Sequence, residues 1–146
     1  MRENRLPRGV SNSNPGNIDR TGVRWQGMAL DQSGDPRFIV FDDAPWGIRA
    51  IVRVLRSYRD KYGLTTVKGI ISRWAPPVEN DTDAYYNTVA KKLGVDPEAE
   101  IDIDDLDTLR GLIKAIIRHE NGPNPAEPDG AWYPDDVIDE GIRRAG

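Results

Sequence analysis

The chain has 146 residues, the composition of an ordinary globular protein and a formal net charge of −4 at pH 7. This length suits one domain with one hydrophobic core, so we expect residues 1–146 to form a single, monomeric domain. The acidic balance argues against nucleic acid as the main partner. The absence of cysteine excludes disulfides, thiolate metal sites and a cysteine nucleophile. The single histidine, His119, excludes histidine-rich metal centres, and we predict neither a metal nor another cofactor.

The hydropathy pattern contains no apolar run of membrane-spanning length. Residues 1–10 lack the apolar region of a signal peptide. We therefore expect a domain that is made in the cytoplasm without a signal peptide and that does not insert into a membrane.

Turn-forming residues dominate positions 1–22, which predicts an ordered loop rather than a helix or a strand. Two short runs with strand composition follow, Val23–Gly27 and Arg37–Phe41, with a turn-rich stretch between them. These two runs predict a small β-hairpin.

Helical patterning begins after the predicted hairpin and continues towards the C-terminus. Apolar residues recur at helical spacing, and glycine or proline stops most runs. The predicted helices are Trp46–Tyr62, Thr66–Trp74, a segment from Asp81 or Thr82 to Leu93, Asp105–Glu120 and Asp135–Arg144. The sequence therefore predicts a mostly α (α+β) fold, a compact domain of about five helices with a small β-hairpin.

Glu120 is the strongest candidate for a catalytic residue. It continues an apolar stripe at helical spacing and ends the predicted helix, so its side chain is expected to be substantially buried. Burial and the negative end of the helix dipole both favour the protonated form of a carboxyl group, which suits a general acid. The alternative is a terminal glutamate that turns to solvent or pairs with an arginine such as Arg49 or Arg73.

Two polar loops are candidates for ligand binding. Arg8–Ile18 holds three asparagines around Pro15-Gly16; they either build a turn or line a cleft that binds a polar ligand such as a sugar. Arg73–Thr82 presents Glu79, the best candidate for a second catalytic carboxylate, although it also precedes a helix start. Asp42 and Asp43 compete with Glu79, but capping of the following helix is their simpler role.

Several segments together resemble a family of small bacteriophage or prophage virion proteins that are labelled only as structural proteins. The resemblance spans nearly the whole chain. It rests on RGVSNSNPGNI, Trp25-Gln26-Gly27, FIVF, Gly47-Ile48-Arg49-Ala50, ISRWAPPVENDTDAYYNTV and AIIRHENG.

A second, weaker resemblance is to flagellar-type glucosaminidases, which are lysozyme-like peptidoglycan hydrolases with a catalytic Glu at the end of a buried helix. Asn14–Ile18 looks like the Asn-rich loop of that family, Trp25–Gly27 like its hairpin entry, and Thr82–Tyr86 like its T-D-x-x-Y pattern. The helix that carries the Glu comes last here instead of first, which implies a circularly permuted, lysozyme-like domain.

The second resemblance implies an enzyme that cleaves the glycan strands of bacterial peptidoglycan, from a phage particle or lysis system, acting at the cell wall. Glu120 would be the general acid, with Glu79 as a second carboxylate. The sugar-binding residues would be Asn14, Asn17, Trp74, Asn80, Tyr86 and Asn121. The alternative function is a non-enzymatic virion protein that binds another phage or host protein.

Three spatial expectations follow. Arg8–Ile18 should lie against the Asn121-Gly122 end of the Glu120 helix, because a permutation moves the chain break without moving the loop. Asn14 or Asn17 should then face Glu120 across a groove wide enough for a sugar ring. The Glu120 helix should be central, with the helices around Leu55, Ile71 and Val89 packed about it.

Overall fold

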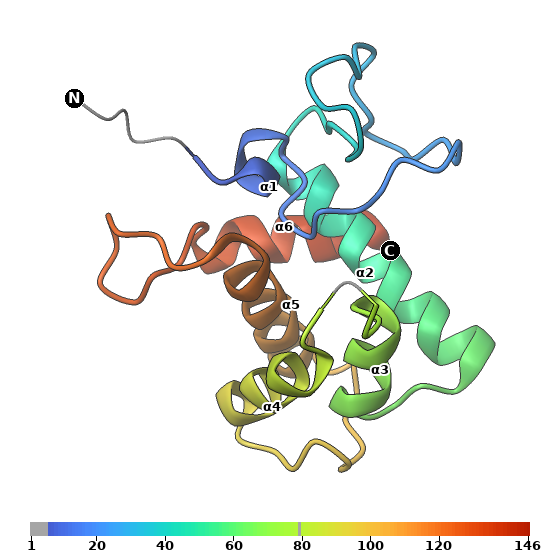
Figure 1. The fold of residues 1–146 in the computed structure, drawn as a ribbon, viewed down its shortest axis with the longest axis vertical. Helices are drawn as coiled ribbons and strands as arrows, with labels where there is room; N and C mark the ends of the chain where they lie inside the picture. The colour runs from blue at the N-terminus through green and yellow to red at the C-terminus, as the bar shows by residue number, and fades with distance from the viewer. Residues whose placement is uncertain (1–5, 79) are drawn as a thin grey trace. The chain divides into compact units, whose positions relative to one another are not determined.

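The computed structural model describes residues 6–78 and 80–146, and these residues form a mostly helical protein (Figure 1). The helices are α1 (Arg8–Ser11), α2 (Ala44–Tyr62), α3 (Val67–Trp74), α4 (Thr82–Leu93), α5 (Leu106–Asn121) and α6 (Asp135–Ala145). The predictions for α2 to α6 are confirmed to within a few residues. The four-residue helix α1 was not predicted, because one turn is too short to show helical periodicity.

The chain divides into two compact units. The terminal unit comprises the described residues up to Val52 together with Ile117–Gly146, and the central unit comprises Arg53–Ile116. Helices α2 and α5 each begin in one unit and end in the other. The expectation of a single domain stays a prediction.

Glycine residues end several helices, and polar side chains cap the start of others, at the positions that the sequence indicates. Gly63, Gly94 and Gly122 have φ values of 65°, 70° and 73°, the left-handed conformation that terminates helices. The side chains of Thr66 and Asp81 accept hydrogen bonds from Gly69 N and Ala84 N and so cap α3 and α4.

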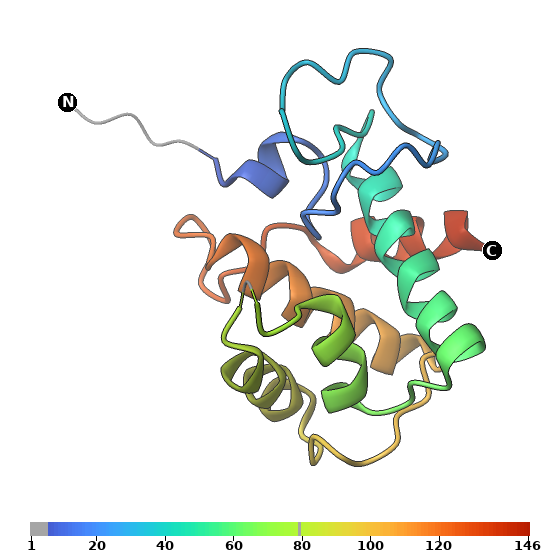
Figure 2. The same ribbon diagram turned by 45° about the vertical axis from the view of Figure 1, so that its right-hand side comes forward.

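Helices α3 and α4 lie side by side in the central unit (Figure 2). Ile70, Ile71, Tyr85 and Val89 bury their side chains there completely. The hydroxyl of Thr82 donates to Ala75 O at 2.6 Å and closes the loop between the two helices.

The predicted apolar stripe of α5 is largely buried: Leu109, Ile113 and Ile116 have at most 2% of their surface exposed. Leu106, at the start of the helix, is 46% exposed. The central position of α5 stays a prediction.

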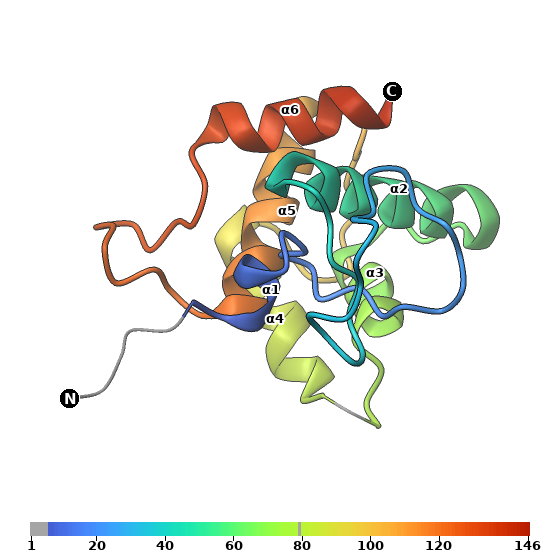
Figure 3. The same ribbon diagram turned by 90° about the horizontal axis from the view of Figure 1, so that it is seen from above.

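In the terminal unit, α6 packs on the first turns of α2 (Figure 3). A Cβ atom at Gly141 would collide with the side chain of Ile48, so glycine permits this close approach. Arg144 holds the same two helices together, because its guanidinium donates to Asp43 Oδ1 at 2.9 Å and lies over the Trp46 ring. Asp43 Oδ1 also accepts from Trp46 N at 3.0 Å, which confirms the predicted capping role of Asp43.

The predicted β-hairpin is wrong. Between residues 18 and 43 the described chain forms only isolated bridges, Asp19 with Phe38 and Met28 with Phe41. The segment Arg37–Phe41 lies between two other segments: Ile39 N bonds to Ile18 O on one side, and Val40 O accepts from Ala29 N on the other. Each pairing is too short to make a strand.

Candidate functional site around Glu120

The Asn-rich loop Arg8–Ile18 lies against the end of α5, as predicted. Asn17 Nδ2 donates to Glu120 Oε1 at 3.2 Å and also reaches the main-chain oxygen of Glu120 at 3.5 Å. Asn121 Nδ2 donates to Pro15 O at 2.8 Å. More than a hundred residues separate these partners in sequence, so the contact is a tertiary feature of the terminal unit.

Main-chain turns and one buried amide shape this loop. Ser13 and Asn17 adopt φ values of 53° and 50°, which non-glycine residues rarely do and asparagine tolerates best. Asn14 is completely buried, and its side chain bonds to Ile18 N, Ile18 O and Ile39 O. Asn14 therefore serves the local backbone, and its expected role in sugar binding stays a prediction.

Gly9 of α1 leaves room for the side-chain amides of Asn17 and Asn121 at the end of α5. A Cβ atom at Gly9 would lie 2.6 Å from Asn121 Oδ1 and 2.7 Å from Asn17 Oδ1. Both amide oxygens are buried and have no N–H or O–H partner among the described residues. They face the Cα of Gly9 instead, an approach that a side chain at position 9 would prevent.

The expected groove between the asparagines and Glu120 is wrong for Asn17, because the two side chains are in direct contact and no sugar ring fits between them. Glu120 is partly buried, neither in the core nor exposed to bulk solvent, so the expected burial is met in part. Its neighbour His119 has its pKa lowered by burial, an effect that the charge of Glu120 opposes.

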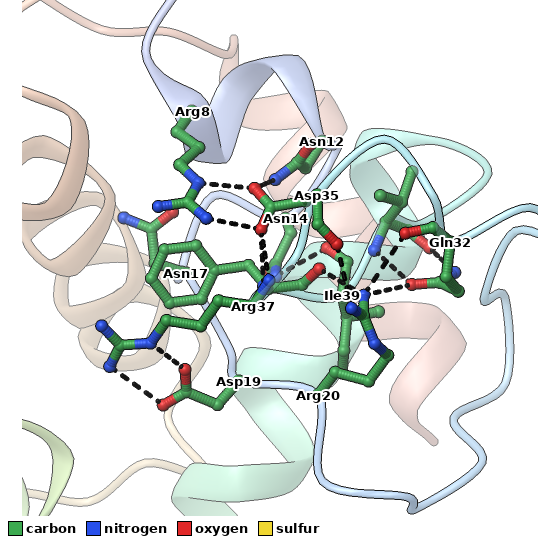
Figure 4. Close-up of polar contacts among 12 residues, drawn as sticks. Arg8, Asn12, Asn14, Asn17, Asp19, Arg20, Gln32, Asp35, Arg37 and Ile39 are labelled. Carbon is green, nitrogen blue, oxygen red and sulfur yellow. Dashed lines mark hydrogen bonds and ion pairs between the residues drawn. The ribbon is translucent and has the colours of Figure 1, made fainter.

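A buried carboxylate, Asp35, anchors the loop to the segment that follows (Figure 4). Asp35 is 3% exposed and accepts from Arg8 Nε at 2.5 Å and from Asn12 Nδ2 at 2.8 Å. The Arg8 guanidinium holds the pKa of Asp35 far below its usual value, and the amides of Arg37 and Phe38 act in the same direction. Sequence reasoning missed Asp35, since its neighbours Gly34 and Pro36 indicate only a turn.

Side-chain bonds replace a strand ladder around Asp35, as Figure 4 also shows. Arg20 donates to the main-chain oxygens of Asp35 and Phe38 at 2.9 and 3.0 Å. Gln32 donates to Val40 O at 2.7 Å and accepts from Val40 N at 2.9 Å. These bonds fix the backbone next to the Asn-rich loop.

The loop after α5 carries two aromatic residues that the sequence analysis also missed. Trp132 Nε1 donates to Gly122 O at 2.8 Å and so ties the loop to the end of the Glu120 helix. The hydroxyl of Tyr133 is buried and has no hydrogen-bond partner among the described residues. Burial raises the pKa of Tyr133 to about 12.

The other predicted site residues belong to the central unit. Trp74 and Tyr86 are half-buried, and Asn80 is exposed with its amide on Pro76 O at 3.3 Å. Glu79 lies outside the described residues. A shared site between these residues and Glu120 stays a prediction.

Within residues 6–78 and 80–146, no cluster of three or more His, Asp and Glu side chains could hold a metal ion. Over the same residues, no helix combines the length and the apolar character needed to cross a membrane.

These features define a mostly helical protein with a polar loop bound to the end of a glutamate-bearing helix, and no family model matches its sequence. The chain is similar to Protein P5 of Pseudoalteromonas phage PM2, with 44% identity over 126 residues that cover 84% of this chain and 76% of that protein. At this identity and coverage, the chain belongs to the family of Protein P5. The predicted resemblance to phage proteins is confirmed, whereas the lysozyme-like relationship stays a prediction.

Proposed function

We propose that this phage protein cleaves the glycan strands of bacterial peptidoglycan, with Glu120 as the general acid. The observation that supports the proposal most is the contact between Asn17 and Glu120. The permuted glucosaminidase arrangement places the Asn-rich loop beside the end of the glutamate helix, and the bond from Asn17 Nδ2 to Glu120 Oε1 agrees with that placement.

The chemistry needs a protonated carboxyl group next to the glycosidic oxygen and stabilisation of an oxocarbenium-like centre at C1. Glu120 supplies the carboxyl group from a half-buried position at the end of a rigid helix. A second carboxylate, for which the sequence offers Glu79, would direct hydrolysis by water. Without a second carboxylate, a hydroxyl or acetamido group of the sugar completes the reaction, as in lytic transglycosylases.

Within the central unit, two aromatic side chains and one amide are the proposed sugar-binding groups. Trp74 and Tyr86 are half-buried, so each keeps part of its ring accessible for stacking on a sugar. Asn80 is exposed and can offer its amide. Asn121 has its Nδ2 on Pro15 O and Ile117 O, so its contribution is to hold the loop that borders Glu120.

A turbidity assay on permeabilised Gram-negative cells tests the activity. The wild-type protein should clear the suspension, and Glu120→Gln should not, because the neutral amide cannot donate an acidic proton. Glu120→Gln should keep the thermal stability of the wild type or exceed it, since it replaces a half-buried acid with a neutral side chain of the same shape. A Glu120→Gln protein that still lyses the cells would reject the mechanism.

A second candidate is a non-enzymatic virion protein that binds another phage or host protein, which family membership with a phage protein favours. In that case the loops around Glu120 form an assembly surface. A wild-type protein that assembles into particles but leaves the cell suspension turbid would support this candidate over the enzyme.

A further inference from the structure

Arg73 belongs to the central unit, and its guanidinium is stacked on two aromatic rings. Its Cζ lies 3.6 Å from the centre of the Tyr62 ring and 5.5 Å from the centre of the Tyr58 ring. Among the residues that the structure describes, Arg73 forms no ion pair and donates no side-chain hydrogen bond. Arg59 of the same unit, by contrast, pairs with Asp104 at 2.8 Å. Because Arg73 is also exposed, its N–H groups are accessible to a ligand.

The ends of α2 and α3 position these three side chains. Tyr58 and Tyr62 are one turn apart on α2, so both rings lie on the same side of that helix. Gly63 ends α2 with a φ of 65°, and the Thr66 side chain caps the start of α3. Arg73 belongs to the last turn of α3 and reaches back over the rings. The stacking holds the guanidinium in place before a ligand binds, which reduces the entropy cost of binding.

The chemistry of this site suits a carboxylate with carbon atoms next to it. Stacking uses the face of a guanidinium and leaves its N–H groups, which point outward in its plane, free to donate. A carboxylate matches this planar fork, because it accepts two parallel hydrogen bonds. Tyr62 is 52% exposed, so its ring also offers an apolar surface to the neighbouring carbon atoms. The charge of Arg73 opposes the rise in the Tyr58 pKa that burial causes, so this hydroxyl lies within reach of the same charge.

We propose that Arg73, stacked on Tyr62 and Tyr58, binds a free carboxylate of the short peptides that the glycan strands of peptidoglycan carry. This inference rests on the proposed function for the identity of the ligand. Such peptides combine free carboxylates with small aliphatic side chains, and so provide both the anion for the guanidinium fork and apolar groups for the exposed part of the Tyr62 ring. Arg73 is then a substrate-binding residue of the central unit and takes no part in breaking the glycosidic bond.

The first test is an NMR titration of the full chain with a synthetic peptidoglycan peptide that contains no sugar and so cannot be cleaved. Spectra are recorded at about pH 5.5, where carboxylates are still ionised. The Nε–H signal of Arg73, assigned by its loss in Arg73→Gln, should shift with the free peptide and not with the same peptide after amidation of its carboxyl groups. This comparison uses the wild type and needs no variant to fold. Equal shifts with both peptides, or tighter binding of inorganic phosphate than of the free peptide, would overturn the proposal.

Variants of the same chain test the planar fork. Arg73→Gln and Arg73→Lys should each weaken binding of the free peptide by about 5-fold or more, because neither side chain can donate two parallel hydrogen bonds to a carboxylate. Lys92→Gln is the matched control: it removes one positive charge from an exposed position of α4 and should leave the affinity within about twofold. Wild-type affinity in Arg73→Gln or Arg73→Lys would contradict the assigned role of Arg73.

The second test measures cleavage of peptidoglycan and separates this inference from the proposed function. Arg73→Gln should raise KM by about 5-fold with kcat within about twofold, since it removes a contact that substrate and transition state share. On peptidoglycan with amidated carboxyl groups, Arg73→Gln and the wild type should have the same KM. A loss of kcat with unchanged KM would overturn the proposal. A wild type that binds the peptide but cleaves no glycan would refute the proposed function alone, and one that cleaves glycan but does not bind the free peptide would refute this inference alone.

Discussion

Asp35 is buried between an exposed arginine and two main-chain amides. No feature of the sequence around it predicted this burial. Its carboxylate accepts from Arg8, Asn12, Arg37 N and Phe38 N, and these bonds connect α1 to the segment before α2. In this part of the terminal unit, the hydrogen bonds of one carboxylate connect segments that a strand ladder would otherwise hold together.

We expect Asp35→Ala to lower the free energy of unfolding by about 3 kcal/mol, because it leaves the buried Asn12 amide and the part-buried amides of Arg37 and Phe38 without this acceptor. The pKa of Asp35 is lowered in the folded state, so its contribution is present above about pH 4 and is lost as the pH falls further. Urea unfolding at pH 7 and pH 3 measures both effects. Asp19→Ala is the control: it removes a half-exposed ion pair with Arg37 and should cost less than about 1 kcal/mol. Equal losses in the two variants would contradict the assigned role of Asp35.

For Tyr133 we expect a substitution that stabilises the protein, because its buried hydroxyl has no hydrogen-bond partner among the described residues. Tyr133→Phe should raise the free energy of unfolding by up to about 1 kcal/mol, because the desolvated hydroxyl is removed while the ring is kept. The raised pKa of about 12 means that the folded state favours the neutral phenol. The contribution of Tyr133 to stability should therefore fall as the pH rises from about 10 to about 12. Ultraviolet titration of the folded protein should lose a late-ionising tyrosine in Tyr133→Phe, while Tyr58, whose pKa is also raised by burial, keeps its late ionisation.

At the scale of elements, helices were predictable and the small non-helical segments were not. Gly63, Gly94 and Gly122 follow apolar runs with helical spacing and end those helices, because few other residues adopt a positive φ at low cost. The residues Arg37–Phe41 have strand composition, but their partners are supplied by side chains of Gln32 and Asn14 as well as by backbone. Composition alone cannot reveal such partners.

The packing of α6 on α2 gives an element-scale prediction. Alanine normally stabilises a helix interior relative to glycine by about 1 kcal/mol. Gly141→Ala should instead destabilise the protein by about 1–3 kcal/mol, because its Cβ would overlap the side chain of Ile48. Gly34→Ala should change stability by less than about 1 kcal/mol, since the nearest atom to its Cβ is Val40 Cγ2 at 4.0 Å. Thermal unfolding of both variants checks the sign, and a stabilised Gly141→Ala would show that the two helices do not pack closely.

At the scale of the whole molecule, the sequence predicted the neighbourhood of the site better than its details. The contact between the Asn-rich loop and the end of α5 was predicted from the permuted resemblance. The three asparagines have different partners: Asn12 binds Asp35, Asn14 binds main chain, and Asn17 binds Glu120. Their spacing in the sequence does not predict these partners, because the partners depend on tertiary contacts. Gly9 was likewise unpredictable, because its role depends on tertiary proximity to Asn121.

Mass spectrometry of the soluble products released from purified peptidoglycan tests the central claim most directly. The wild-type protein should release disaccharide-peptide fragments, whose masses contain one added water after hydrolysis and none after transglycosylation. Glu120→Gln should release none, while Asp19→Ala, which changes an ion pair away from the carboxyl group, should match the wild type. Fragments released equally by Glu120→Gln, or none released by the wild type, would contradict the assignment of Glu120 as a glycan-cleaving acid.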